Sequence, residues 1–286
     1  ATELIFLWMK VLKPKKTLII SPTFAEYERA LKEVNSEVYY FELTEGNDEF
    51  YLDFEKLREE LKKSYNLVIL CNPNNPTGSF VNRENFKELL NDINFSSTNF
   101  FIDEAFIDFI RNGEDLSFKH FESDRVIIIR AFTKFFGIPG LRLGYSICYN
   151  KKWVSTANNL KEPWTINTFA ASCGEILLNS NKYIEKTYKT LEKEKNRMLN
   201  GLKKIENIQV FKSESNFLLI KLMEISGTEL YNKLLEKGFL IRRCENFNFL
   251  DDSYVRIAIK DKKSNKKDKG NKKDKKKSKK MVLKKK

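Results

Sequence analysis

The sequence predicts an α/β protein with a mostly parallel sheet sandwiched by helices, followed by a smaller C-terminal α+β domain. Up to Tyr149, short runs of β-branched and aromatic residues alternate with segments whose apolar residues recur at helical spacing. This alternation is typical of parallel strands joined by helices. After Tyr149 a long charged helical segment precedes shorter segments of mixed character, which indicates a second unit.

Each element follows from its own residue pattern. Six apolar runs are predicted to be strands of the main sheet: Thr17–Ser21, Val38–Leu43, Leu67–Cys71, Asn99–Asp103, Arg125–Ala131 and Leu143–Tyr149. Three segments with helical spacing are predicted to lie between them: Glu26–Val34, Phe54–Lys63 and Asn82–Asn94. The smaller unit is predicted from a helix over Ser180–Ile205 and from the segments Phe217–Leu222, Gly227–Lys237, Phe239–Arg242 and Tyr254–Lys260. We therefore expect a large domain over residues 1–179 and a small domain over residues 180–260.

The positive charge of the chain is concentrated at its C-terminus. The net charge is +13, and residues 261–286 hold 15 lysines and three aspartates, so the rest of the chain is nearly neutral. The high pI therefore gives no support to nucleic-acid binding by the folded part. Because the tail has too few apolar residues to fold, we expect it to be disordered, either simply solvated or as a tether to nucleic acid or membrane.

Composition also excludes several kinds of chemistry. His120 is the only histidine, which argues against a Ser-His-Asp triad and against multi-histidine zinc sites, so no metal is expected. Cys71, Cys148, Cys173 and Cys244 are far apart and form no CxxC pair, which argues against a zinc ribbon or a secreted disulfide scaffold. With no apolar run near the ~18 residues of a membrane helix and no leader pattern, a soluble protein of the reducing cytoplasm is expected.

Two polar segments follow predicted strands. A rigid loop rich in Asn and Pro, Asn72–Gly78, follows the strand that ends at Cys71, and Asp103 ends the next strand. Both are expected at the carboxyl edge of the sheet, where open α/β folds bind ligands. The loop could equally be an ordinary tight turn, and Asp103 could be a helix N-cap or a surface acid.

A third segment brings a lysine among aromatic residues. Lys134 follows the strand that ends at Ala131 and is flanked by phenylalanines. Partial desolvation would lower the pKa of this amine and so increase its nucleophilic fraction. Arg142, eight residues later, has a planar guanidinium suited to a phosphate, although it could instead form a structural ion pair.

Taken together, these motifs resemble those of a known superfamily. Asn-Pro-Thr-Gly at 75–78, Asp-x-Ala-aromatic at 103–106, Thr-Lys at 133–134 and Gly-Leu-Arg-Leu-Gly at 140–144 occur in order. The sequence resembles, over about residues 1–260, the fold type I pyridoxal-phosphate enzymes of the aspartate aminotransferase superfamily. Within it, Ser21–Tyr27, Ala131–Phe136 and Leu240–Cys244 are most similar to the threonine-phosphate decarboxylases of cobalamin biosynthesis, with the histidinol-phosphate aminotransferases next.

The resemblance implies the pyridoxal-phosphate transferase fold, a homodimer and a set of cofactor-binding residues. Lys134 would bind pyridoxal 5'-phosphate covalently, and Asp103 would pair with the pyridine nitrogen, which makes the ring an electron sink. Asn75 would donate to the ring hydroxyl oxygen, and Phe24 would stack on the ring, unless Phe24 is plain core.

The cofactor phosphate would lie at the start of an N-terminal helix. Ala1 and Thr2 would offer backbone amides at the start of the helix that runs toward Val11, joined by Thr133 and Arg142. A small phosphorylated amino acid would be the substrate: Arg256 would pair with its α-carboxylate and Arg242 with its phosphate, while Asn75 would also face it. As isolated residues, both arginines could be surface charges.

Three departures from the family pattern accompany the resemblance. The chain begins at Ala1, where the family has a preceding segment, so we expect an N-terminal truncation that removes part of the substrate pocket. Phe106 stands where these aminotransferases commonly have a tyrosine, and Ala131 stands where a hydroxyl residue often helps to hold the phosphate.

Three functions remain open at this point. The first is a lyase that decarboxylates L-threonine O-3-phosphate to (R)-1-aminopropan-2-yl phosphate, and the second is a histidinol-phosphate-type aminotransferase. The third, of another class, is a non-catalytic fragment whose lysine tail binds polyanions. The same residue types serve decarboxylation and transamination, so spacing alone does not choose between them, and neither enzyme is expected to bind membrane or nucleic acid.

Overall fold

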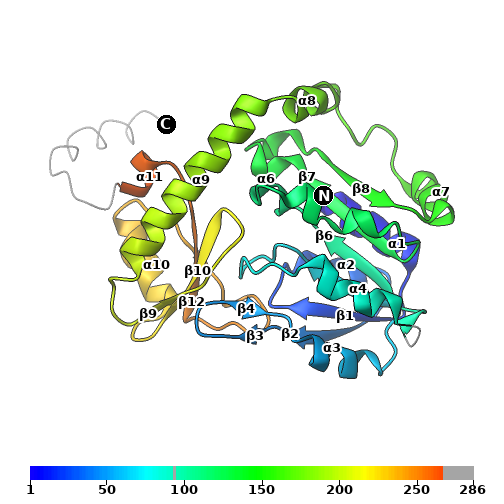
Figure 1. Cartoon of the computed structure of the whole chain (residues 1–286), viewed down its shortest axis with the longest axis horizontal. Coiled ribbons are helices and arrows are strands. Elements are labelled where there is room, and N and C mark those ends of the chain that lie inside the picture. Colours follow the sequence, from blue (N-terminus) through cyan, green and yellow to red (C-terminus); the bar gives the residue numbers. More distant parts are fainter. Residues whose placement is uncertain (93–94, 267–286) are drawn as a thin grey trace, which may run out of the picture.

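A six-stranded sheet forms the centre of the computed structural model, which describes residues 1–92 and 95–266 (Figure 1). Its order is β2-β1-β5-β6-β7-β8. The strands are β1 (Lys16–Ser21), β2 (Glu37–Glu42), β5 (Leu67–Cys71), β6 (Asn99–Asp103), β7 (Val126–Ala131) and β8 (Gly144–Cys148). All neighbours pair in parallel except β7 and β8. The predicted mostly parallel sheet is therefore confirmed. β8 runs the other way, and its connection from β7, residues 132–143, holds only one short helix and a 3-10 turn.

Helices cover both faces of this sheet. One face packs against α1 (Thr2–Leu12), α2 (Glu26–Lys32) and α7 (Lys151–Leu160). The other packs against α3 (Phe54–Leu61) and α4 (Arg83–Asn91), and this core continues into the C-terminal part of the chain. β5 and β6 are buried along their whole length apart from Asn99, which explains why they read as continuous apolar runs. The helix predicted over Asn82–Asn94 ends at Asn91, and part of that prediction lies outside the described residues.

The C-terminal part is a smaller α+β unit, as predicted. Its antiparallel sheet has the order β11-β12-β10-β9, formed by β11 (Arg242–Arg243), β12 (Tyr254–Ala258), β10 (Phe217–Leu222) and β9 (Ile208–Val210). Helices α9 (Asn181–Leu202) and α10 (Gly227–Glu236) accompany it, and Figure 1 shows α9 running from α8 (Thr168–Leu178) toward this sheet. Since α9 also packs on Phe135 of the larger part, the boundary at residue 180 stays a prediction.

The segment Phe239–Arg242, predicted to belong to this unit, contributes only Arg242 to the two-residue strand β11, and Leu240 is 75 % exposed. The prediction for the tail is wrong at its boundary. The disordered tail was expected from residue 261, but Lys262–Lys266 form the helix α11, where Asn265 Nδ2 donates to Glu194 at 3.0 Å. Residues 267–286 lie outside the described residues.

Several short elements were not foreseen. They are β3 (Thr44–Glu45), β4 (Phe50–Tyr51), α5 (Gly113–Leu116), α6 (Phe132–Phe135) and three 3-10 turns at Ile107–Phe109, Phe118–Phe121 and Pro139–Leu141. In residues 1–92 and 95–266, no helix combines the length and apolar composition that crossing a membrane requires.

Candidate active site

A cavity of about 590 Å³ opens at the carboxyl edge of the main sheet, between that edge and the small sheet. All ten residues predicted for the site line it: Ala1, Thr2, Phe24, Asn75, Asp103, Thr133, Lys134, Arg142, Arg242 and Arg256. Phe106 and Ala131, the two departures from the family pattern, line it as well. The structure thus brings the whole predicted set together, while the roles of these residues toward a cofactor stay predictions.

The parallel register explains this convergence. Cys71 of β5 lies beside Asp103 of β6, and Asp103 lies beside Ile129 of β7. The loop with Asn75 follows β5 directly, and Lys134 comes shortly after β7. Because these three strands end at one edge, residues from three distant parts of the sequence share one cavity wall.

Asp103 is buried and held by two hydrogen bonds. Its Oδ2 accepts from the Tyr27 hydroxyl at 2.7 Å, and its Oδ1 accepts from the Ala105 backbone N–H at 2.9 Å. Burial raises the pKa of this carboxyl, and the bond from Tyr27 acts in the opposite direction. Tyr27 is a site residue that sequence reasoning missed. It stands three residues after Phe24 in the motif that carried the resemblance, in the first turn of α2, whereas Phe24 precedes that helix.

Lys134 has the surroundings of a nucleophilic amine. Burial lowers its pKa, and the positive charge of Arg256 lowers it further. Its Nζ lies 5.8 Å from the centre of the Phe106 ring. Within residues 1–92 and 95–266, no carboxylate forms an ion pair with Lys134. An amine with a lowered pKa is uncharged in a larger fraction of molecules and can attack a carbonyl carbon.

The start of α1 is an uncapped helix N-terminus that faces the cavity. Ala1 is the N-cap and makes no side-chain capping bond, so the first backbone N–H groups are free to meet an anion. Gly144 of β8 allows the close approach, because a Cβ there would lie 2.9 Å from the Ala1 nitrogen and 2.7 Å from the Arg130 oxygen. Arg142 also lines this cavity, with one Nη1 hydrogen bond to the Pro139 oxygen at 3.0 Å.

Two arginines of the small sheet close the other side of the cavity. Arg242 and Arg256 are register partners on β11 and β12. Arg256 donates to Asn75 Oδ1, and its guanidinium lies 4.8 Å from the centre of the Phe217 ring. Arg242 donates to Asn246 Oδ1 at 2.6 Å. Neither arginine forms an ion pair with a carboxylate of the described residues.

The cavity is therefore strongly positive. Lys134, Arg142, Arg242 and Arg256 line it, and Asp103 is the only acidic side chain among its lining residues. Such a field attracts anions, and the arginines can bind phosphate or carboxylate groups through two parallel hydrogen bonds.

Asn216 and Phe217 also line the cavity. Sequence reasoning missed them because no motif marks the turn that precedes β10.

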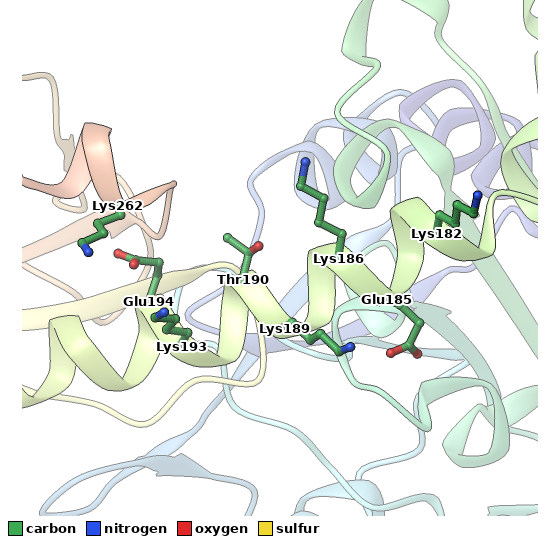
Figure 2. Close-up of a pocket in the computed structure, with 8 residues that line it drawn as sticks. All are labelled: Lys182, Glu185, Lys186, Lys189, Thr190, Lys193, Glu194 and Lys262. Atoms are coloured by element: carbon green, nitrogen blue, oxygen red, sulfur yellow. The ribbon is translucent and has the colours of Figure 1, made fainter.

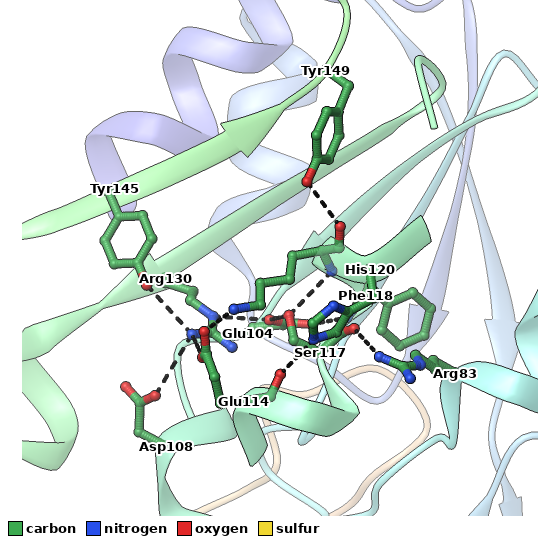
Figure 3. A network of polar contacts seen from close by, with 11 residues as sticks. Arg83, Glu104, Asp108, Glu114, Ser117, Phe118, His120, Arg130, Tyr145 and Tyr149 are labelled. Carbon is green, nitrogen blue, oxygen red and sulfur yellow. Dashed lines mark hydrogen bonds and ion pairs between the residues drawn. The ribbon is translucent and has the colours of Figure 1, made fainter. Parts of the chain in front are cut away.

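A buried polar network is centred on Glu104, the residue that follows Asp103 in the chain (Figure 3). The Glu104 carboxylate accepts from Arg130 Nε at 3.0 Å, from the Ser117 hydroxyl at 2.7 Å and from the Phe118 backbone N–H at 2.7 Å. His120 belongs to the edge of this network, with its Nε2 at 3.1 Å from the Glu114 oxygen. The only histidine therefore lies outside the cavity, in agreement with chemistry that does not depend on it.

A second depression, on the exposed side of α9, is of a different kind (Figure 2). It is lined by Lys182, Glu185, Lys186, Lys189, Thr190, Lys193, Glu194 and Lys262. Figure 2 shows the lysine side chains extending from α9 without converging on one point. The two acids pair elsewhere, Glu185 with Arg111 and Glu194 with Arg197. This face is a solvated helix surface and contains none of the predicted site residues.

Comparisons with known proteins agree with this geometry. The family model described as "Aminotransferase class I and II" matches residues 1–267. A protein of Caldanaerobacter subterraneus subsp. tengcongensis, provisionally named a threonine-phosphate decarboxylase, is 39% identical over 272 residues, covering 93% of this chain and 72% of the relative. The threonine-phosphate decarboxylase of Salmonella typhimurium is 32% identical over 266 residues, with the same two coverages. The crystal structure of the histidinol-phosphate aminotransferase from Clostridium acetobutylicum superposes with a TM-score of 0.85 at 39% identity, covering 93% of this chain and 78% of that one.

Proposed function

We propose that this chain, which belongs to the class I and II aminotransferase family, is a pyridoxal-phosphate-dependent lyase. Its proposed reaction is the decarboxylation of L-threonine O-3-phosphate to (R)-1-aminopropan-2-yl phosphate, a step of cobalamin biosynthesis. The names of the two decarboxylases above support this reaction. The observation that carries it is the pair Arg242 and Arg256, two neighbouring cations without a carboxylate partner in the described residues.

The substrate's charges match this pair. L-threonine O-3-phosphate carries a carboxylate and a phosphate, one anion for each arginine, whereas histidinol phosphate carries only the phosphate. Arg256, the more buried of the two, is assigned the carboxylate, and Arg242 at the cavity rim is assigned the phosphate. A substrate with two anions therefore compensates both guanidinium groups, while a substrate with one leaves a cation unpaired.

The donor set of the cavity fits pyridoxal phosphate. The uncapped start of α1 offers free N–H groups to a phosphate, and Lys134 offers an amine to an aldehyde. Asp103 offers a carboxylate to a protonated ring nitrogen, and Phe24 offers an aromatic face. When bound, pyridoxal phosphate supplies an electron sink that accepts the electron pair released at the substrate's α-carbon.

The remaining steps belong to the chain's own residues. Asp103, which accepts hydrogen bonds from the Tyr27 hydroxyl and the Ala105 N–H, would hold the protonated ring nitrogen through its carboxylate. Arg256 orients the substrate carboxylate, and its bond to Asn75 links that orientation to the loop after β5. Lys134 in its ammonium form would deliver the proton that replaces the carboxylate, and burial, which lowers its pKa, makes that ammonium a stronger proton donor.

The proposal includes a homodimer in the cytoplasm. Large apolar side chains are exposed along α8 and the loop before it: Trp164 is 95 % exposed, Phe169 77 %, Ile176 66 % and Leu178 61 %. A cluster of this kind is typical of a surface that a second subunit covers. The cysteines of the described residues are free thiols, which agrees with a reducing compartment. Light scattering on a size-exclusion column tests the assembly directly.

Gas release tests the reaction. The chain is incubated with pyridoxal phosphate and L-threonine O-3-phosphate, without a keto acid, and carbon dioxide is measured. In parallel, it is incubated with histidinol phosphate and 2-oxoglutarate, and glutamate is measured. Carbon dioxide in the first reaction supports the decarboxylase. Glutamate without carbon dioxide would indicate an aminotransferase, the second candidate function. The name of the Clostridium acetobutylicum structure supports that candidate. If neither product forms, both proposed activities are refuted.

A further inference from the structure

Tyr27 makes a buried contact with Asp103, the acidic residue of the cavity. Its side chain is fully buried on α2, and its hydroxyl donates to Asp103 Oδ2 at 2.7 Å. The other carboxylate oxygen accepts from the Ala105 N–H at 2.9 Å. One donor comes from α2 and the other from the turn after β6, so both oxygens are fixed from two different elements. The plane of the carboxylate is then defined before any ligand arrives.

The hydroxyl of Tyr27 remains a donor under all ordinary conditions. Burial raises the pKa of Tyr27 well above 10, and the charge of Asp103 raises it further. On the other side of the contact, this bond lowers the pKa of Asp103 against the effect of burial. Other groups that act on the Asp103 carboxyl are the Ala1 amino group and the Lys134 amine, and the Cys71 thiol lies beside Tyr27. Tyr27 is the one that contributes a side-chain hydrogen bond.

The same tyrosine also contacts Phe24, which lines the cavity. The two rings meet edge to face, with centroids 5.8 Å apart and an interplanar angle of 86°. Tyr27 thus touches Phe24, the residue proposed to face the cofactor ring, and Asp103, the residue proposed to meet its nitrogen. The Tyr27 side chain therefore contacts both residues that would contact the cofactor ring: Phe24 at its face and Asp103 at its nitrogen.

We infer that Tyr27 is a positioning residue that orients the Asp103 carboxylate toward the cavity and keeps it ionised. The inference deepens the proposed function, on which its meaning for the cofactor rests. Through Asp103, Tyr27 would strengthen the pairing with a protonated ring nitrogen and so the electron sink on which decarboxylation depends. Its effect is therefore expected on the rate of the chemical step more than on substrate binding.

The test replaces Tyr27 by phenylalanine, which keeps the ring and removes only the hydroxyl. In the cofactor-free protein, carbon-13 NMR of labelled aspartate should show a higher pKa for Asp103 in Tyr27→Phe. With pyridoxal phosphate bound, kcat for L-threonine O-3-phosphate should fall about tenfold, since a hydrogen bond to a charged group contributes roughly that factor or more. KM should stay unchanged, and the pH dependence of the bound cofactor's absorbance should shift.

Tyr65 provides a matched control. It is also buried, and its hydroxyl donates to the Glu60 carboxylate at 2.6 Å, away from the cavity. Tyr65→Phe removes the same kind of bond and should cost similar stability, but it should leave the pKa of Asp103, the cofactor absorbance and kcat unchanged. A merely structural role for Tyr27 predicts that both variants behave alike.

The outcomes separate this inference from the proposed function. An unchanged Asp103 pKa in cofactor-free Tyr27→Phe would overturn the inference even if the enzyme is a decarboxylase. An unchanged kcat and cofactor absorbance would do the same. A wild-type chain that binds no pyridoxal phosphate would overturn the proposed function, and the Asp103 pKa in the cofactor-free protein would still decide whether Tyr27 keeps this carboxylate ionised.

Discussion

Replacing Arg130 by methionine should destabilise the chain by about 3 kcal/mol. The side chains of Arg130 and Glu104 are only 4 % and 0 % exposed, and their charged atoms lie 3.0 Å apart. Without the guanidinium, the buried Glu104 carboxylate keeps only the donors Ser117 Oγ and Phe118 N. Removal of one partner of a buried ion pair costs about 3–5 kcal/mol, and these two donors place the expected value at the lower end.

A double-mutant cycle by urea denaturation measures this coupling. Arg130→Met and Glu104→Gln are made singly and together, and the double variant should recover a substantial part of the summed loss, because the buried Glu104 carboxylate is then replaced by an uncharged amide. Lys233→Met serves as the control. Its ion pair with Glu229 is 62 % and 48 % exposed, so the loss should stay below about 1 kcal/mol. If the two single losses add without coupling, the reasoning about the buried pair is refuted.

Three further predictions concern the cavity and its surroundings. Arg256→Lys should lower kcat/KM for L-threonine O-3-phosphate about 10- to 100-fold, because an ammonium cannot replace the planar two-bond contact with a carboxylate. Steady-state kinetics measure this value, and an unchanged kcat/KM would contradict the carboxylate contact. Gly144→Ala should cost about 1–3 kcal/mol of unfolding free energy, since its Cβ would press on the Ala1 nitrogen and the Arg130 oxygen, and an unchanged urea midpoint would exclude the close contact. Burial raises the pKa of Asp108 to about 6, so the folded state binds a proton that the unfolded state has released. The stability of the wild type relative to Asp108→Asn should therefore fall between about pH 4 and pH 6, and a rise over that interval would reverse the assignment.

Strands and the location of the site could be predicted because they depend on local patterns. Leu67–Cys71 and Asn99–Asp103 are continuous apolar runs, and the structure has both strands with those bounds. Once parallel pairing is expected, the residues after these strands must share an edge. The segment Phe239–Arg242 shows the limit of such patterns, because an apolar run becomes a strand only where a partner strand pairs with it, and here only Arg242 is paired while Leu240 is exposed.

Contacts between distant residues could not be predicted in this way. The bond between Tyr27 and Asp103 joins α2 to the end of β6, and its existence depends on how α2 packs on the sheet. The pair of Arg130 and Glu104 depends likewise on the register of β6 and β7. Individual side chains of this kind carry no periodic signal. The resemblance supplied the roles of single residues that local patterns left open.

The attachment point of pyridoxal phosphate on the chain decides whether Lys134 is the cofactor-binding lysine. The protein is mixed with pyridoxal phosphate, reduced with borohydride so that a bond between the aldehyde and an amine becomes permanent, and mapped by peptide mass spectrometry. We expect Lys134 to carry the label at one equivalent per chain and Lys134→Ala to lose it. The 15 lysines of residues 261–286 provide an internal comparison. A label spread over those lysines, with Lys134 unmodified, would show that Lys134 is not the cofactor-binding lysine.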